Sequence, residues 1–366
     1  MELMKKASET INKIMSEIKP PDAAAMAAAA ARQAALAKPP GSLGKLEEIS
    51  VRLAGITGDI TPHIEKCRVI VMCADNGVCV EGVSSAPVSV TAAQAINMTR
   101  RLTGMSSIAA YFGDDVDVVD VGISTPYDCP EIFNAKIRPG TDNIAAGPAM
   151  TVDETIRAIE VGISSAKRAA DDGIDVIGVG EMGIGNTTTS SAVLAALTEI
   201  PAKEITGRGG GLTDEAFARK LLVIDRALLL NKPDPGDVID VLAKVGGFDI
   251  AAMCGVFLGA AAYRLPAVID GFISAVAALA AYKIAPASRE YMFPSHVSAE
   301  PGYSAAMEAL GLDPWLSLDM RLGEGSGCPL AFRVMQAACA AMNGMAAFGG
   351  ESGIDDGYLD EIRKKL

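Results

Sequence analysis

The chain has 366 residues, half of them apolar and 21 % charged, which excludes a disordered protein and favours one large or two moderate globular domains. Its net charge of −13 argues against nucleic acid and anionic lipid as partners, because an acidic surface repels both. Seven cysteines without a CxxC pair, beside only two histidines, predict buried thiols in a reducing, cytoplasmic setting rather than metal ligands.

The N-terminal region predicts three helices, at 1–18, 23–37 and 45–53, which proline-rich segments separate. Residues 1–19 lack the apolar core of a signal peptide. The most apolar region, 250–281, is interrupted by charged residues and a proline, so we expect no membrane span.

Nearly continuous apolar runs then predict strands that are buried on both faces, as in a parallel sheet. These runs are 67–73, 116–121, 174–179 and 265–269. Helical patterns lie between or after them, at 90–102, 152–170, 188–197, 215–229, 248–262 and 272–282. The alternation predicts an α/β fold, with a mostly parallel, Rossmann-like sheet and helices on both faces.

The strands are expected to stop at about Pro286, and 301–310 and 330–347 are predicted to be helical. We therefore expect a large α/β nucleotide-binding domain over 60–290. A small helical domain is expected to combine 1–59 with 291–366.

Ligands of parallel sheets bind beyond the carboxyl ends of the strands, where the segment 178–189 (GVGEMGIGNTTT) is the clearest candidate. Its glycines allow a ligand close to the backbone, and the N–H groups at the following helix start suit a phosphate. Glu181 is an acid within this turn. An ordinary strand-to-helix turn would have the same letters, and a dinucleotide fingerprint fits poorly because Glu181 and Gly185 would crowd a pyrophosphate.

Two further glycine-rich segments could contact a ligand. The loop 206–212 (TGRGGGL) can present several N–H groups to one phosphate, with Arg208 and Lys220 as charges, or it can be a flexible surface loop. In 318–328 (LDMRLGEGSGC), Glu324 lies among glycines that indicate a special backbone shape, although a helix-capping loop is the alternative. Three smaller segments could each, taken alone, be a simple turn or helix cap: 74–77, 270–272 and 295–300. His296, taken alone, is more often a hydrogen-bonded structural residue than a catalyst.

Together these segments resemble the nicotinate-nucleotide:dimethylbenzimidazole phosphoribosyltransferase family, which assembles the lower ligand of cobamides, the vitamin B12 group. The strings that carry the resemblance follow in the expected order: KPPGSLGKLE from Lys38, ADNGV from Ala74, GEMGIGNTTTSSA from Gly180, GRGGGL from Gly207, VIDGFISA from Val268, SHVSAEPGY from Ser295 and LDMRLGEGSG from Leu318. The resemblance implies a parallel sheet flanked by helices, a smaller domain from both chain ends, and a homodimer with sites near its interface.

The resemblance also implies roles for individual residues. Glu324 matches the family's general base, and Glu181 matches a second carboxylate near the base-binding pocket. The positions expected to bind substrate are Gln94, Gly183, Gly185, Asn186, Thr187, Gly207, Arg208, Gly209, Gly210, Lys220, Asp270, Ser298, Arg321 and Leu322. Ala86-Pro87 stands where a hydroxyl residue is expected, and GRGGG where GRGTG is expected, which leaves the accepted base open.

The implied reaction moves ribose phosphate from nicotinate mononucleotide to dimethylbenzimidazole or a related flat base, giving α-ribazole phosphate and nicotinate. It requires no metal and no redox cofactor. Other benzimidazoles, adenine and phenolics stay open as acceptors. Two other classes compete: a nucleotide-dependent oxidoreductase, and a base-binding carrier that has lost turnover.

Overall fold

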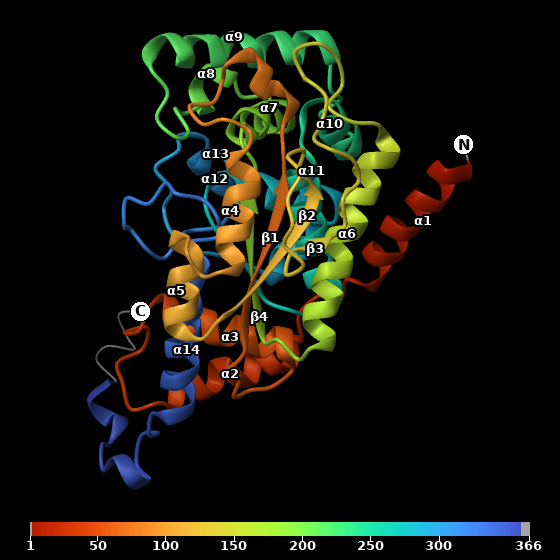
Figure 1. Cartoon of the computed structure of the whole chain (residues 1–366). Helices are drawn as coiled ribbons and strands as arrows, with labels where there is room; N and C mark the ends of the chain where they lie inside the picture. The colour runs from red at the N-terminus through yellow and green to blue at the C-terminus, as the bar shows by residue number, and fades with distance from the viewer. Residues whose placement is uncertain (1, 360–366) are drawn as a thin grey trace. The chain divides into compact units, whose positions relative to one another are not determined.

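The computed structural model describes residues 2–359, and a six-stranded, all-parallel sheet is its main β-structure (Figure 1). The strands are β1 (Cys67–Ala74), β2 (Asp115–Gly122), β3 (Phe133–Asn134), β4 (Val176–Met182), β5 (Ala267–Ile269) and β6 (Met292–Pro294). Their order is β3-β2-β1-β4-β5-β6, so the direction of winding reverses between β1 and β4. Ligand crevices form at such a reversal in doubly wound sheets.

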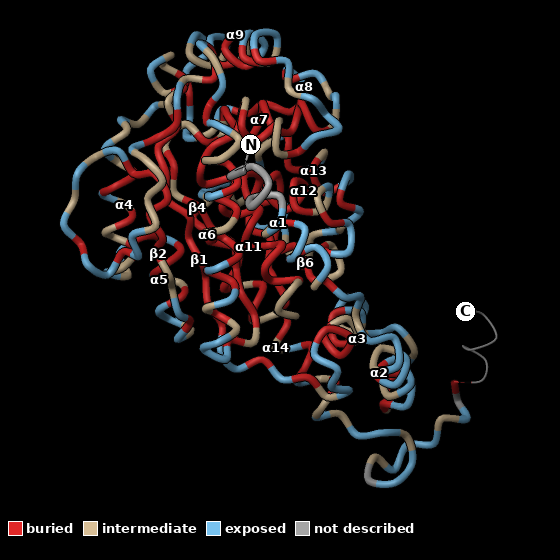
Figure 2. Tube along the Cα trace, turned by 90° about the vertical axis from the view of Figure 1, so that its right-hand side faces the viewer, coloured by how far each residue is buried: buried red, intermediate tan, exposed pale blue. Residues whose placement is uncertain are grey.

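Helices cover both faces of this sheet. On one face α4 (Val90–Thr99) and α5 (Gly104–Phe112) pack on the strands, and on the other α11 (Phe248–Ala262) and α12 (Phe272–Ile284) do so. Figure 2 shows these two layers on opposite sides of the buried strands β1 and β4. The outer helix α6 (Val152–Asp171) packs on α11, where a Cβ on Gly255 would overlap the Ile159 carbonyl. Small residues thus allow close helix packing, as the glycine content suggests.

The remaining helices extend this framework. They are α1 (Glu2–Glu17), α2 (Ala23–Ala35), α3 (Lys45–Thr57), α7 (Asn186–Thr198), α8 (Ala202–Ile205), α9 (Asp214–Asn231), α10 (Val238–Val245), α13 (Gly302–Leu310) and α14 (Cys328–Gly344). Short 3-10 helices are η1 (Gly77–Glu81), η2 (Pro286–Tyr291), η3 (Gly350–Ser352) and η4 (Asp356–Leu359).

The described chain forms two compact units. The larger unit combines 2–19 with 66–331 and holds the whole sheet. The smaller unit combines 20–65 with 332–359, and in it α2 packs on α3 around Ala29, Ala54 and Met342. These bounds differ from the expected ones of 60–290 and of 1–59 with 291–366, and the division into a nucleotide-binding and a small helical domain stays a prediction.

The structure confirms an α/β fold and corrects one expectation. Strands do not stop at Pro286, because β6 follows and pairs with β5. With only Met292, Phe293 and Pro294, this strand is too short to show a pattern in the sequence.

The cysteines are mostly buried, as expected. No disulfide joins any of the seven, all of which lie among the described residues, and only Cys79 is partly exposed. None of the helices within 2–359 has both the length and the apolar character that crossing a bilayer requires.

Candidate active site

A cavity of about 270 Å³ opens at the carboxyl ends of β4 and β5, within the larger unit. Every residue predicted to form the site lines it except Gly207 and Lys220; Lys220 bonds to Gly207 and to Thr187, which is part of the lining. Its apolar lining includes Val83, Val90, Met182 and Leu322, and its polar lining includes the carboxylates of Glu181 and Glu324. An apolar slot beside convergent polar groups is typical of a site for a small ligand.

Glu324 occupies an unusual backbone conformation at the edge of this cavity. Its φ is +65°, and the flanking Gly323 and Gly325 are also left-handed, at +82° and +90°. A non-glycine residue is strained in this region, and such strain persists only where the surrounding structure enforces it. The special backbone shape indicated by the glycines is therefore present.

The Glu324 carboxylate is held by two donors from the α4 and α5 layer. Gln94 Nε2 donates to Oε1 at 3.4 Å, and the Met105 backbone N–H donates to Oε2 at 3.2 Å. Asn97 donates in turn to the amide oxygen of Gln94 at 3.0 Å, which fixes the orientation of the Gln94 amide. Burial raises the pKa of Glu324, while the Met105 hydrogen bond lowers it.

Asp270 fixes the loop that carries Glu324. Its two carboxylate oxygens accept the backbone N–H groups of Gly327 at 2.7 Å and of Gly325 at 3.1 Å. The Asp270 carboxylate lies 3.9 Å from Nδ1 of the buried His296, which also contacts the Ser295 hydroxyl at 3.0 Å. Asp270 thus acts on the loop backbone as well as lining the cavity.

Glu181 is almost fully buried and links the two glycine turns. Its Oε1 accepts the Glu324 backbone N–H at 3.2 Å, and its Oε2 accepts from the side-chain amide of Asn186. Burial raises the pKa of Glu181 to about 8, and the Asn186 hydrogen bond acts in the opposite direction. Its carboxyl group is therefore mostly neutral at pH 7 when the cavity is without ligand.

The carboxyl group of Glu300 lies beside the glycine loop 207–211. The Gly209 N–H donates to Oε1 of Glu300 at 3.0 Å, and Oε2 of Glu300 is buried without a hydrogen-bond partner among the described residues. The buried Lys220 ammonium donates to the Thr187 hydroxyl at 2.9 Å and to the Gly207 carbonyl at 3.0 Å. Burial lowers the pKa of Lys220 to about 8, and the charge of Glu300 opposes this shift.

The other residues predicted to bind substrate have fewer contacts with the two catalytic candidates. The Arg208 guanidinium pairs with Asp214 and donates to the Leu212 carbonyl, so it stabilises the N-terminal end of α9. Arg321 and Leu322 line the cavity from exposed positions. Ser298 lines it and accepts the Glu300 N–H at 3.4 Å.

Sequence reasoning missed several contributors. Ser84 and Ser85 line the cavity beside Ala86, so hydroxyl groups stand just before the position where one was expected. Met105 was missed because α5 was not predicted, although Thr103 and Ser106 form a capping box that could have marked its start. Glu300 lies in the SHVSAEPGY string, but no role was assigned to it.

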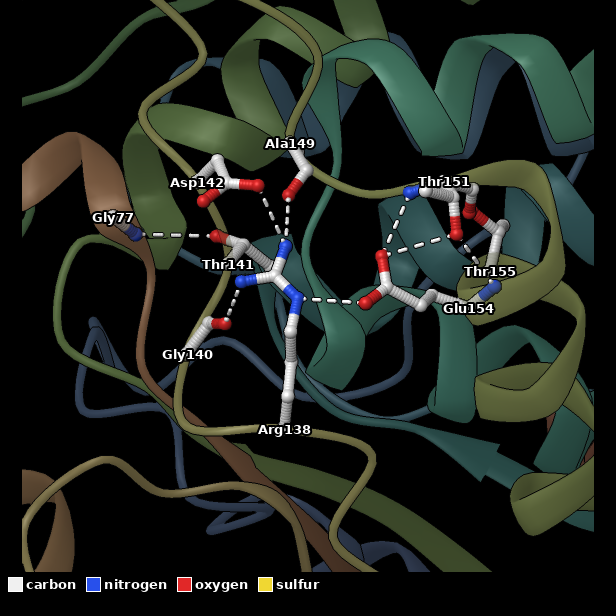
Figure 3. Close-up of polar contacts among 9 residues, drawn as sticks. All are labelled: Gly77, Arg138, Gly140, Thr141, Asp142, Ala149, Thr151, Glu154 and Thr155. Atoms are coloured by element: carbon white, nitrogen blue, oxygen red, sulfur yellow. Dashed lines mark hydrogen bonds and ion pairs between the residues drawn. The ribbon is translucent and has the colours of Figure 1, made fainter.

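The loop after β1 contacts the segment 138–149, which Arg138 holds in place (Figure 3). Its guanidinium donates to Glu154 at 2.7 Å and to the carbonyls of Gly140 at 2.7 Å and Ala149 at 3.1 Å. The Thr141 hydroxyl, in the loop so held, accepts the Gly77 N–H at 3.1 Å. This network anchors the ADNG turn next to the cavity.

No group of three or more metal-ligating side chains occurs among residues 2–359.

Comparisons with known proteins identify the family of this chain. A family model for phosphoribosyltransferases matches residues 18–353. A nicotinate-nucleotide–dimethylbenzimidazole phosphoribosyltransferase of Ruminiclostridium cellulolyticum is 52 % identical over 340 residues, which cover 93 % of this chain and 97 % of that protein. A protein of the same name from Clostridium tetani is 47 % identical over 363 residues, 99 % of each chain. The crystal structure of CobT from Thermus thermophilus matches with a TM-score of 0.87 at 40 % identity, over 91 % of this chain and 99 % of that one.

Proposed function

Because this chain belongs to the phosphoribosyltransferase family that includes these enzymes, we propose that its cavity holds nicotinate mononucleotide beside a flat aromatic base. The chain transfers the phosphoribosyl group to dimethylbenzimidazole or a related base and releases nicotinate. The product, α-ribazole phosphate, is the activated lower ligand in cobamide (vitamin B12) assembly.

One observation carries the assignment of the chemistry to this cavity: the buried Glu324 carboxylate faces it from a strained, tightly held loop. The bond between C1′ and the nicotinate nitrogen breaks, and its electron pair neutralises the pyridinium, so the leaving group needs no proton. One ring nitrogen of the incoming base bonds to C1′ from the opposite face. The proton on its other ring nitrogen passes to Glu324, whose raised pKa suits a general base.

The transition state carries positive charge on the ribose, as in other glycosyl transfers. Ionised carboxylates beside C1′ would stabilise that charge, which gives Glu181 a role when the cationic donor is bound. A phosphate site at the glycine loop is supported by two donors there: the Gly209 N–H, and the Lys220 ammonium, which bonds to the Gly207 carbonyl and the Thr187 hydroxyl. The phosphate would replace the Glu300 carboxylate on that N–H.

We also propose that the active form is a homodimer in the cytoplasm. Three large apolar side chains are strongly exposed on α9 and on the neighbouring η1, namely Val80 (79 %), Leu222 (71 %) and Leu229 (76 %). Exposed apolar side chains on two neighbouring elements support contact with a second copy. Seven cysteines without a disulfide support a reducing compartment.

Incubation of the pure protein with nicotinate mononucleotide and a panel of flat bases tests the function, with nicotinate and riboside phosphate followed by mass. Release with a benzimidazole is the expected result. If nicotinate is released only with adenine or only with a phenolic, the proposed reaction type stands but the accepted base is a different one. Binding of the nucleotide without any release would instead favour a carrier protein.

A further inference from the structure

Asp249 is a fully buried carboxylate that the mechanism above does not use. It lies in the first turn of α11, and its Oδ2 accepts the side-chain amides of Asn186 at 3.0 Å and of Asn76 at 3.5 Å. Its Oδ1 accepts the N–H of Ile250 at 3.0 Å. Burying a carboxylate is costly unless several donors compensate it, so this arrangement requires a reason.

The hydrogen bonds around Asp249 run in one direction. The Thr189 hydroxyl donates to Oδ1 of Asn76 at 3.0 Å, and Nδ2 of Asn76 donates to Asp249. Nδ2 of Asn186 donates both to Asp249 and to Glu181. A carboxylate only accepts, whereas an amide can present either its NH₂ or its oxygen. Asp249 therefore makes Asn186 present its NH₂ group toward Glu181.

We propose that Asp249 is a positioning residue for the transfer reaction: through Asn186 it fixes the Glu181 carboxyl group, and through Glu181 the backbone of Glu324. The chain of contacts joins α11, the turn after β4 and the loop before α14. This inference rests on the proposed function, because it assigns the residue to the same cavity.

Asp249 also acts on Glu181 through its charge. The titratable groups that face Glu181 are Asp249 on α11, Asp270 after β5, Glu324 before α14 and the Cys73 thiol on β1. Burial raises the pKa of Glu181 to about 8, and the negative charges of Asp249 and Asp270 add to that rise. Loss of the Asp249 charge alone lowers the pKa of Glu181, but loss of the Asn186 hydrogen bond that Asp249 orients raises it, and the hydrogen bond is the larger of the two effects.

The test compares wild type with Asp249→Asn, which keeps the size of the side chain and can rotate an NH₂ group toward Asn186. Wild-type kcat should rise with pH as Glu181 ionises. In the variant, kcat at the plateau should fall about 10- to 100-fold, as expected for a displaced catalytic group, with the KM for nicotinate mononucleotide nearly unchanged. The midpoint of the pH profile should also move to higher pH, because Asn186 turns its amide oxygen toward Glu181 and the hydrogen bond that lowers the pKa of Glu181 is lost.

Asp120→Asn is the matched control, because Asp120 is equally buried on β2 but bonds to Tyr127, Lys136 and backbone N–H groups. It should change neither kcat nor the midpoint. In a Glu181→Gln background the pH dependence caused by Glu181 should be absent, and adding Asp249→Asn should not change the pH profile further.

If Asp249→Asn does not fold, Asn186→Ser supplies the same test, because a hydroxyl can donate to only one of the two carboxylates. An active wild type with an unshifted pH profile in the folded variant would overturn the role of Asp249. An inactive wild type would overturn the proposed function instead.

Discussion

Glu324 combines three properties: burial, a left-handed backbone and a carboxylate held by donors from another layer of the fold. The strain is compensated by Asp270, which binds the N–H groups of Gly325 and Gly327. Without these contacts the loop could relax to an ordinary conformation. The geometry therefore points the carboxylate into the cavity before any substrate binds.

Replacement of Glu324 by Gln removes the proton acceptor while preserving the shape of the side chain. We predict a fall in kcat of about 10²- to 10⁴-fold, the usual effect of losing a general base. Binding of nicotinate mononucleotide, measured by calorimetry, should survive. Turnover within about threefold of wild type would remove Glu324 from the mechanism.

We expect Lys220 to contribute to binding of the donor phosphate and not to the transfer step itself. In Lys220→Met the charged donor is lost, so the KM for nicotinate mononucleotide should rise about 10- to 100-fold with a smaller change in kcat. Because burial lowers the pKa of Lys220 to about 8, the wild-type KM should also rise above pH 8, and that of the variant should not. The exposed Lys203→Met is the control, and an equal effect there would contradict a specific role for Lys220.

At the scale of elements, the turn between β4 and α7 depends on Gly183. A Cβ at this position would overlap Oδ2 of Asp249 and would lie 2.5 Å from the Ala74 carbonyl oxygen. We predict that Gly183→Ala displaces Asp249 and the β1 loop and lowers both stability and kcat. Thermal unfolding and steady-state kinetics would measure this.

Gly147→Ala is the comparison for that variant, because a Cβ there meets nothing within 4 Å and its φ is not left-handed. It should unfold and turn over like wild type. Similar behaviour of the two variants would show that close approach at Gly183 is not required.

Sequence patterns located the long elements well and the short ones poorly. Helix α11 was predicted with its observed bounds, since its apolar run is long and its ends carry clear signals. In contrast, β3 has two residues and β6 three, and α5 follows a turn whose capping box was not recognised. Short elements acquire their structure from pairing and packing, which a local pattern does not contain.

For the molecule as a whole, the motifs indicated most of the cavity lining, because ligand sites of parallel sheets collect at one edge. The sequence could not predict which side chains form hydrogen bonds between segments that are far apart along the chain. The links from Asp249 to Asn186 and from Glu300 to Gly209 each span many residues, and only the fold brings these groups together.

The buried carboxyl of Glu181 should make global stability depend on pH. Its folded pKa of about 8 lies above the ordinary value of 4.5, so folding favours the neutral form. The stabilisation is complete below pH 4.5 and is lost as pH rises toward 8, with a slope of about 1.4 kcal/mol per pH unit in between. Asp249, with a pKa of about 6, changes the pH dependence of stability mainly below pH 6. Lys220, with a pKa of about 8, changes it mainly above pH 7.5. Between about pH 6 and 7.5 the effect of Glu181 therefore dominates over these two.

We therefore predict that the melting temperature of the ligand-free wild type falls between about pH 6 and 7.5, and that Glu181→Gln flattens this dependence because an amide does not titrate. Differential scanning calorimetry across the window would measure it. Glu308→Gln, at an exposed position on α13, should retain the wild-type slope. Parallel curves for wild type and Glu181→Gln would mean that Glu181 is ionised in the folded protein throughout the window, and its part in the pH profile of catalysis would fail with it.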